Sequence, residues 1–293
     1  MTTTPQTYHQ PVMVAEVLEG LKVRAGGTYI DCTLGDGGHG NAILKSSAPG
    51  GRLLGIDADT EACAAAKRRL GLFGDTVAIV PSYFDSLHAV AHASSCVPSD
   101  GVLFDLGLSS RQLDAEDRGF SFQREGPLDM RFSQDAEVTA EQLVNELDEE
   151  ELANVIYAYG EERRSRRIAK AIVASRPVTD AKELAEIVRR SSGYPRGRTH
   201  PATRTFQALR IAVNDEIDRL NAGLAQALDV LGKGGRLVTI SYHSLEDREI
   251  KRFMGSAPDS LRVVNKKVIR PSKEEVARNR RSRSAKLRVA ERT

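Results

Sequence analysis

The stretch Asp31-Cys-Thr-Leu-Gly35-Asp-Gly37-Gly38-His39-Gly40 decides the fold class of this 293-residue chain. It starts within an apolar run at 28–33, which reads as a short buried strand, and it leads into a helical pattern from about Asn41. Glycines at such a turn let a ligand approach the backbone closely, and the N–H groups that open the helix favour a carboxylate or phosphate. The spacing Gly35-x-Gly37-x-x-Gly40 matches the dinucleotide fingerprint, although a tight strand-to-helix turn explains it nearly as well.

The sequence around this loop alternates strand and helix patterns. Apolar runs at 52–56, 76–80, 101–104 and 236–240 read as further buried strands, and the Ala-rich segment 60–70 carries charges at helical spacing. Such alternation predicts βαβ units and a parallel sheet.

The middle of the chain has a different pattern. Between about Leu113 and Arg204 no strand is convincing, and capping signals at Thr139, Asp148 and Asp180 predict helices. We therefore expect an α/β fold in which residues 1–112 and 205–293 form the sheet domain and residues 113–204 form an all-helical insertion.

The last ninety residues return to the α/β pattern. One long helix is expected from Pro201, with Phe206 to Leu224 along one face. Two β-rich pieces, 261–264 and 287–290, close the chain, and the second alternates with charges as an edge strand would.

Composition and charge exclude several classes of protein. Hydrophobic residues are 40% and charged residues 28%, which argues against global disorder. No apolar run is long enough to span a membrane and no signal peptide is visible, so no membrane partner is expected. Cys32, Cys63 and Cys96 form neither a CxxC pair nor a zinc ligand set, and a cytoplasmic protein is the natural interpretation.

The net charge of +2 is unevenly distributed. The stretch 261–293 has 12 Lys and Arg against 3 Asp and Glu, a charge of +9, which leaves −7 for the other residues. A basic end on an acidic body suggests contact with a polyanion, and a solvated tail remains an equal alternative.

Asp57 supports an adenosine site at the glycine loop. It ends the second strand, where a carboxylate can accept hydrogen bonds from two ribose hydroxyls. The alternative is a helix N-cap, but Asp59 or Thr60 suits that role better. Both NAD and S-adenosylmethionine fit such a site. The carboxylate of Asp31, the aromatic pair after the third strand and the turn at 232–235 favour the methyl donor.

Eight motifs resemble the MraW/RsmH family of bacterial 16S rRNA cytosine-N4 methyltransferases, in order from about Tyr8 to Arg292. The motifs are Tyr8-His-Gln-Pro-Val-Met13, Asp31 to His39, Asp105-Leu-Gly-Leu-Ser-Ser-Arg-Gln-Leu-Asp114, Arg118-Gly-Phe-Ser-Phe122, Gly126-Pro-Leu-Asp-Met-Arg131, Tyr159-Gly-Glu-Glu-Arg163, His200-Pro-Ala-Thr-Arg-Thr-Phe-Gln-Ala-Leu-Arg210 and Ser241-Tyr-His-Ser-Leu-Glu-Asp-Arg248. The resemblance implies a class I, Rossmann-like S-adenosylmethionine methyltransferase. The implied substrate is N4 of a cytidine in the decoding region of 16S rRNA, within the small ribosomal subunit or its precursor.

The resemblance also implies the site residues. The cofactor contacts carried over are Gly37, Gly38, His39, Asp57, Phe84, Asp105 and Gln112. Asp105 is a candidate acceptor for the N–H groups of the reacting amine. His243 is a candidate acceptor for the departing proton, and a hydrogen-bonded structural histidine is at least as good an interpretation.

RNA contacts are expected where cations and aromatic rings mix, because such rings stack on unpaired bases. The candidates are Arg118, Phe120, Phe122, Arg131, Arg196, Arg198 and Arg204. Two alternatives from other classes stay open at this point. One is an NAD-dependent oxidoreductase, and the other is a noncatalytic RNA-binding ribosome-assembly protein that keeps a vestigial cofactor fold.

Overall fold

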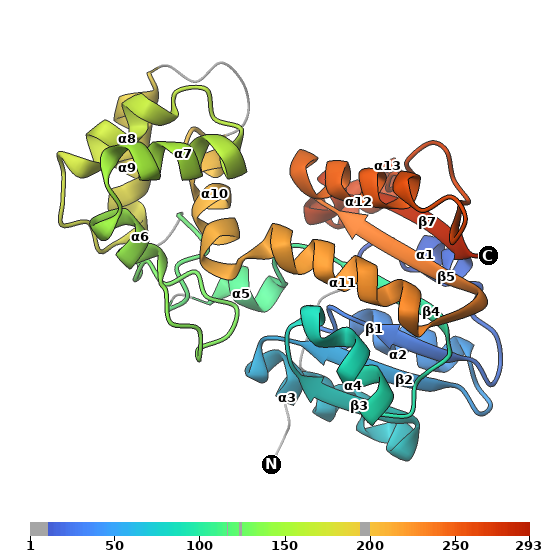
Figure 1. Ribbon diagram of the computed structural model, residues 1–293. Helices are drawn as coiled ribbons and strands as arrows, with labels where there is room; N and C mark the ends of the chain where they lie inside the picture. Colours follow the sequence, from blue (N-terminus) through green and yellow to red (C-terminus); the bar gives the residue numbers. More distant parts are fainter. Residues whose placement is uncertain (1–10, 116, 123–124, 194–199) are drawn as a thin grey trace, which may run out of the picture. The chain divides into compact units, whose positions relative to one another are not determined.

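The computed structural model describes residues 11–115, 117–122, 125–193 and 200–293, and it divides into two compact units (Figure 1). We call Met1–Gly107 together with Ile217–Thr293 the sheet unit, and Leu108–Glu216 the helical unit. An α/β sheet interrupted by a helical insertion is the predicted fold class, which is confirmed.

The sheet unit contains seven strands in the order β3-β2-β1-β4-β5-β7-β6. Their bounds are β1 Thr28–Asp31, β2 Arg52–Asp57, β3 Val77–Pro81, β4 Ser99–Asp105, β5 Leu231–Ser241, β6 Leu261–Val263 and β7 Lys286–Arg292. The first five strands in this order pair in parallel, whereas β7 runs antiparallel to both of its neighbours. The expectation that 287–290 forms an edge strand is therefore wrong, because β6 covers the outer side of β7. Leu287, Val289 and Ala290 are all buried, because the apolar cores on the two faces of the sheet cover their side chains.

Helices cover both faces of the sheet (Figure 1). Their bounds are α1 Val14–Gly20, α2 Gly38–Ser46, α3 Thr60–Leu70, α4 Leu87–Ala93, α11 Glu216–Val230, α12 Ser244–Ser256 and α13 Lys273–Arg278, with short 3-10 turns η1 Gly71–Thr76, η2 Phe84–Ser86 and η3 Arg280–Ser284. One apolar core joins the sheet to α4, α11 and α12, and a second joins it to α1, α2 and α3. This is the layering that βαβ units impose, because each crossover helix packs back on the sheet.

The helical unit has its own core. Its helices are α5 Ser110–Asp114, α6 Ala140–Glu146, α7 Glu149–Gly160, α8 Ser165–Val173, α9 Ala181–Ser192 and α10 Thr203–Asn214. The predicted capping signals are confirmed, since Thr139, Asp148 and Asp180 accept backbone N–H groups at the starts of α6, α7 and α9. Across both units, no helix in the described ranges is long and apolar enough to cross a membrane.

The single long helix expected from Pro201 is wrong. Asp215 adopts a left-handed conformation, with φ 49°, and ends α10 before α11 begins. Phe206, Leu209 and Val213 of α10 pack in the core of the helical unit. The division of the chain therefore falls after Gly107 and Glu216, not after residues 112 and 204 as expected.

Candidate functional site

The glycine loop is held by the carboxylate at the end of the neighbouring strand. Gly35 and Gly37 adopt positive φ angles of 52° and 78°, which side chains rarely tolerate. The Gly35 N–H donates to Asp57 Oδ2 at 2.7 Å, and the Asp59 N–H donates to Asp57 Oδ1 at 2.9 Å. A carboxylate has further lone pairs, so ribose hydroxyls can still bind to it. Burial raises the pKa of Asp57 to about 6, against these hydrogen bonds, which lower it.

Asp59, one of the two predicted alternatives, is the N-cap of α3. Its side chain accepts the N–H groups of Glu61 and Ala62. The N-cap interpretation of Asp57 therefore does not apply, and its carboxylate holds the glycine loop instead.

Asp31 is a buried carboxylate with one unsatisfied oxygen. It is 1% exposed. Its Oδ1 accepts the Thr33 N–H at 3.1 Å, whereas Oδ2 has no hydrogen-bond partner in the part of the chain that the structure describes. Burial raises the pKa of Asp31 to about 7, although the charge of His39 and the Thr33 hydrogen bond lower it. An orphaned carboxylate oxygen of this kind is suited to a cationic ligand group.

Asp105 lies where β4 ends, with both carboxylate oxygens close to donors. The phenol of Tyr242 donates to Oδ1 at 2.9 Å, and His39 Nε2 lies 3.4 Å from Oδ2. The Asp105 backbone N–H donates to Thr33 Oγ1 at 2.7 Å, which ties β4 to the glycine loop. The ends of β1, β4 and β5 thus meet at Asp105.

His39, a predicted cofactor contact, is buried beside two carboxylates. Burial alone would lower its pKa, but the nearby carboxylate of Asp105, together with the charge of Asp31, raises the pKa overall. The predicted residues Asp57, Asp105 and His39 therefore line the carboxyl edge of β1, β2 and β4, with Gly37 and Gly38 at the start of α2.

Tyr242 and Thr33 are polar residues of this edge that the sequence analysis did not select. Tyr242 lies directly after β5, which pairs with β4 so that Ile240 is opposite Asp105. A polar aromatic residue one step past a buried strand was the available signal, but its partner lies 137 residues away in the sequence.

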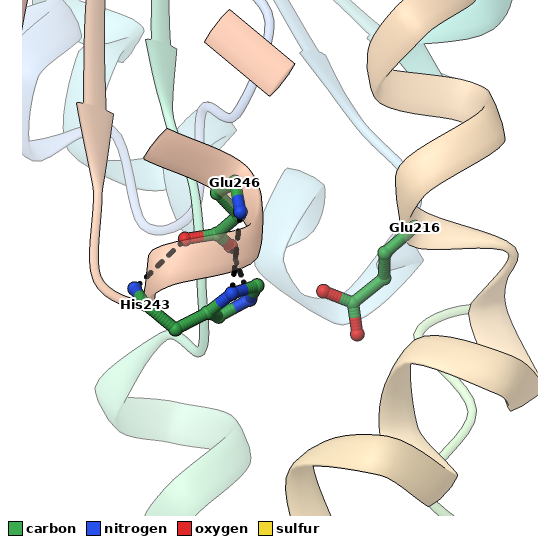
Figure 2. A group of neighbouring side chains, drawn as sticks. All are labelled: Glu216, His243 and Glu246. Carbon is green, nitrogen blue, oxygen red and sulfur yellow. Dashed lines mark hydrogen bonds and ion pairs between the residues drawn. The ribbon is translucent and has the colours of Figure 1, made fainter. Parts of the chain in front are cut away.

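His243 forms the N-cap of α12, and Figure 2 shows its ring facing the Glu246 carboxylate. Nδ1 accepts the Glu246 N–H at 3.3 Å, which leaves the proton of a neutral ring on Nε2, 3.0 Å from Glu246 Oε1. Glu246 is 3% exposed, and its Oε2 accepts the Tyr242 N–H at 2.8 Å. The structural interpretation of His243 thus has clear partners, and its role as proton acceptor stays a prediction.

Phe84 opens η2 after β3 and is half-buried. Its ring meets Phe104 edge-on at 5.5 Å, and it packs so closely on Gly223 of α11 that a Cβ there would lie 2.9 Å from the ring. Beside it, the Arg219 guanidinium lies 3.8 Å above the Tyr83 ring and pairs with Asp85. A contact of Phe84 with adenine stays a prediction.

Two predicted RNA-binding arginines are engaged within the helical unit. Arg118 is 5% exposed and donates to the carbonyls of Arg131 and Phe132, both at 3.0 Å. The Arg131 guanidinium pairs with both oxygens of Asp129 and donates to two further carbonyls. Both side chains stabilise the 129–136 loop through these internal hydrogen bonds. Any contact that they make with RNA would be a second role.

The other candidates of the helical unit differ in exposure. Phe120 is buried and stacks on Phe132, whereas half-buried Phe122 stacks on His200 at 4.6 Å. Exposed Arg204 donates to the Glu161 carbonyl at 3.2 Å. Gln112 also belongs to this unit and closes a capping box with Ser109 at the start of α5. Arg196 and Arg198 lie outside the described residues.

The fold and the site together define the class. A parallel sheet in the order β3-β2-β1-β4-β5, an antiparallel β7 inserted beside β5, and a glycine loop after β1 are the architecture of a Rossmann-like class I methyltransferase. The acidic residues that end β1, β2 and β4 lie at the edge where such folds bind their ligands.

Comparison with known proteins supplies the particular family. The family model described as the MraW methylase family matches residues 6–293. Ribosomal RNA small subunit methyltransferase H of Dehalococcoides mccartyi is 53% identical, covering 97% of this chain and 86% of that protein. The protein of the same name from Thermomicrobium roseum is 48% identical, covering 98% of this chain and 94% of that protein, and the one from a Nostoc species is also 48% identical. The chain belongs to the MraW methylase family and is an S-adenosylmethionine-dependent methyltransferase. The oxidoreductase alternative is therefore set aside.

Proposed function

We propose that this protein transfers a methyl group from S-adenosylmethionine to N4 of a cytidine in the decoding region of 16S rRNA. The substrate would be the small ribosomal subunit or its precursor, in the cytoplasm. The observation that carries the proposal is the match to relatives named for methylation of small-subunit rRNA. These relatives are 53% and 48% identical to this chain along nearly its whole length. The N4 atom and the decoding region come from the motif resemblance alone.

The residues at the carboxyl edge of the sheet suit this cofactor. Asp31 offers a buried carboxylate oxygen without a partner among the described residues, which complements an ammonium or sulfonium group. Asp57 has lone pairs left for ribose hydroxyls, and the loop at Gly37 and Gly38 exposes backbone at the start of a helix. When bound, S-adenosylmethionine supplies a methyl group on a positively charged sulfur. Phe84 and Gln112 complete the proposed contacts.

The chemical difficulty lies in the nucleophile. The cytosine N4 amine is conjugated with the ring, so the protein must align it with the reacting methyl group and accept hydrogen bonds from its N–H groups. Asp105 is our candidate acceptor, because Tyr242 and His39 hold its carboxylate at a fixed place on the sheet edge. His243 is the candidate for taking up the released proton after the amine has reacted.

The helical unit is proposed to contact the RNA. Phe122 and Arg204 are its best-placed candidates among the described residues. The Phe122 ring is partly exposed, and Arg204 is exposed. Arg118, Phe120 and Arg131 have internal partners, so we propose that they shape the RNA-binding loop more than they touch the substrate.

The test uses small ribosomal subunits isolated from cells that lack this enzyme. Incubation with methyl-labelled S-adenosylmethionine should place label on one cytidine, and nucleoside mass spectrometry should show N4-methylcytidine. The test variant is Asp105→Asn, which preserves the side-chain shape but removes the charge and should transfer label more slowly than wild type. Label on another atom would contradict the N4 assignment. No transfer by folded, cofactor-bound protein would favour the noncatalytic assembly protein.

A further inference from the structure

A group of exposed cations lies between β6 and β7. The loop at 264–270 carries Lys266, Lys267 and Arg270, α13 starts with Lys273, and η3 carries Arg280 and Arg283. We call these six residues the basic rim. Within the described ranges none of the six forms an ion pair with a carboxylate.

Neighbouring cations of the same segment are partnered. Lys286 and Arg288 pair with Asp247, and Arg262 pairs with Glu291. These ion pairs hold β6 and β7 in the sheet unit. The basic rim is therefore a part of the +9 segment whose charge is left available to a partner.

The strand register places the basic rim at the edge of the sheet that carries the cofactor site. Lys286, the first residue of β7, is opposite Ser241, the last residue of β5. Because β7 is antiparallel to β5, the chain that enters β7 comes from the carboxyl edge of the parallel strands. η3 ends two residues before Lys286, so Arg280 and Arg283 lie at that edge.

Two further contacts tie the segment to the same edge. Ile269 exchanges backbone hydrogen bonds with Leu287, which places the 264–270 loop beside the start of β7. In α13, Glu275 Oε1 accepts the Met13 N–H at 2.7 Å. Pro11 lies two residues before Met13 and packs against Gly38. A Cβ atom added to Gly38 would be 3.1 Å from the Pro11 ring. α13 is thus linked to the glycine loop through residues 11–13.

We propose that the basic rim binds the phosphate backbone of the RNA segment that flanks the target nucleotide, and so holds that segment against the cofactor edge. The proposal rests on the proposed function, because RNA is the polyanion that must reach this edge. Exposed cations without ion pairs can bind phosphates without first losing a protein partner, and each contact releases condensed counterions. The rest of the chain carries −7, so attraction for RNA is concentrated on this side of the sheet unit.

The test measures binding of a fluorescein-labelled single-stranded oligoribonucleotide across a salt series. The rim variant is Lys273→Ala with Arg280→Ala and Arg283→Ala. Three lost phosphate contacts should lower the magnitude of the log–log salt slope by up to about 2, at roughly 0.7 per contact. Affinity at 0.1 M salt should then fall by up to about 100-fold, and the loss should shrink towards 1 M salt.

The matched control is Lys45→Ala with Lys67→Ala and Arg68→Ala. It removes the same charge from exposed positions in the last turns of α2 and α3. These helices return from the carboxyl edge, so their ends lie at the opposite edge of the sheet. The control should keep the wild-type slope. A second variant, Arg280→Lys with Arg283→Lys, keeps the charge and should keep the slope too, and cofactor affinity should be unchanged in all three.

Equal losses in the rim and control variants would overturn the proposal, since they would show a general effect of net charge. An unchanged slope in the rim variant would overturn it as well. The proposed function fails separately, if wild-type protein transfers no methyl group to small ribosomal subunits.

Discussion

The buried carboxylate of Asp31 should make the stability of the cofactor-free protein depend on pH, and Asp31→Asn should remove the part of that dependence that Asp31 contributes. Burial holds the pKa of this group at about 7, well above the 3.8 of an aspartate in water. Because the folded-state pKa is raised, the stabilising effect of the protonated form is complete below about pH 4 and is lost as pH rises through 7. The loss grows by about 1.36 kcal/mol per pH unit up to the folded-state pKa and then levels off, so between pH 5 and pH 8 this one group costs about 3 kcal/mol.

The assay is urea denaturation followed by far-UV circular dichroism, because the chain has no tryptophan to report by fluorescence. Wild type and Asp31→Asn are compared at pH 5, 6, 7 and 8. The stability of the variant relative to wild type should rise by about 3 kcal/mol across this range, because the amide never ionises. The matched control is Asp75→Asn at an exposed position of η1, which should shift the curve equally at every pH.

Cofactor binding should show the opposite trend. If Asp31 faces the cationic part of S-adenosylmethionine, the ionised form binds it, so wild-type affinity should increase from pH 6 to pH 8 and the variant should lack this increase. A difference in stability between wild type and Asp31→Asn that does not change with pH would refute the account of Asp31 as a buried, easily protonated carboxyl. If the stability depends on pH but the cofactor affinity does not, Asp31 is a buried carboxyl that does not contact the cationic group of the cofactor.

Three further substitutions test other parts of the structure. Asp57→Ala should weaken cofactor binding by about 1–3 kcal/mol in calorimetry, because it removes the ribose acceptor and frees the Gly35 N–H; affinity within twofold of wild type would contradict the ribose assignment. Tyr242→Phe should slow methyl transfer about 5- to 10-fold in single turnover, the cost of about 1–1.4 kcal/mol for one hydrogen bond to Asp105. Its cofactor affinity should stay within twofold, and an equal loss in both would mean that the phenol only supports the fold. Asn214→Ala should destabilise the helical unit by about 2–4 kcal/mol in urea, because the buried amide bonds three backbone groups; a loss below about 0.5 kcal/mol would refute this.

The local features of the fold were readable from the sequence. Strand positions follow from short apolar runs, and helix starts follow from caps such as Thr139 and Asp180, because both depend on residues only a few positions apart. The glycine loop and Asp57 were readable for the same reason, since a strand-to-helix turn needs positive φ angles at fixed places. The motifs then indicated the family, which the family model confirms.

Only the tertiary structure decided the long-range relations. The break at Asp215 was hidden, because the apolar positions continue through it and the left-handed turn depends on packing in the helical unit. The place of β7 between β5 and β6 was hidden too, since strand order depends on pairing partners and not on the strand's own residues. For the same reason Tyr242 could not be joined to Asp105 from the sequence: their hydrogen bond spans 137 positions and exists only because β4 and β5 pair in one register.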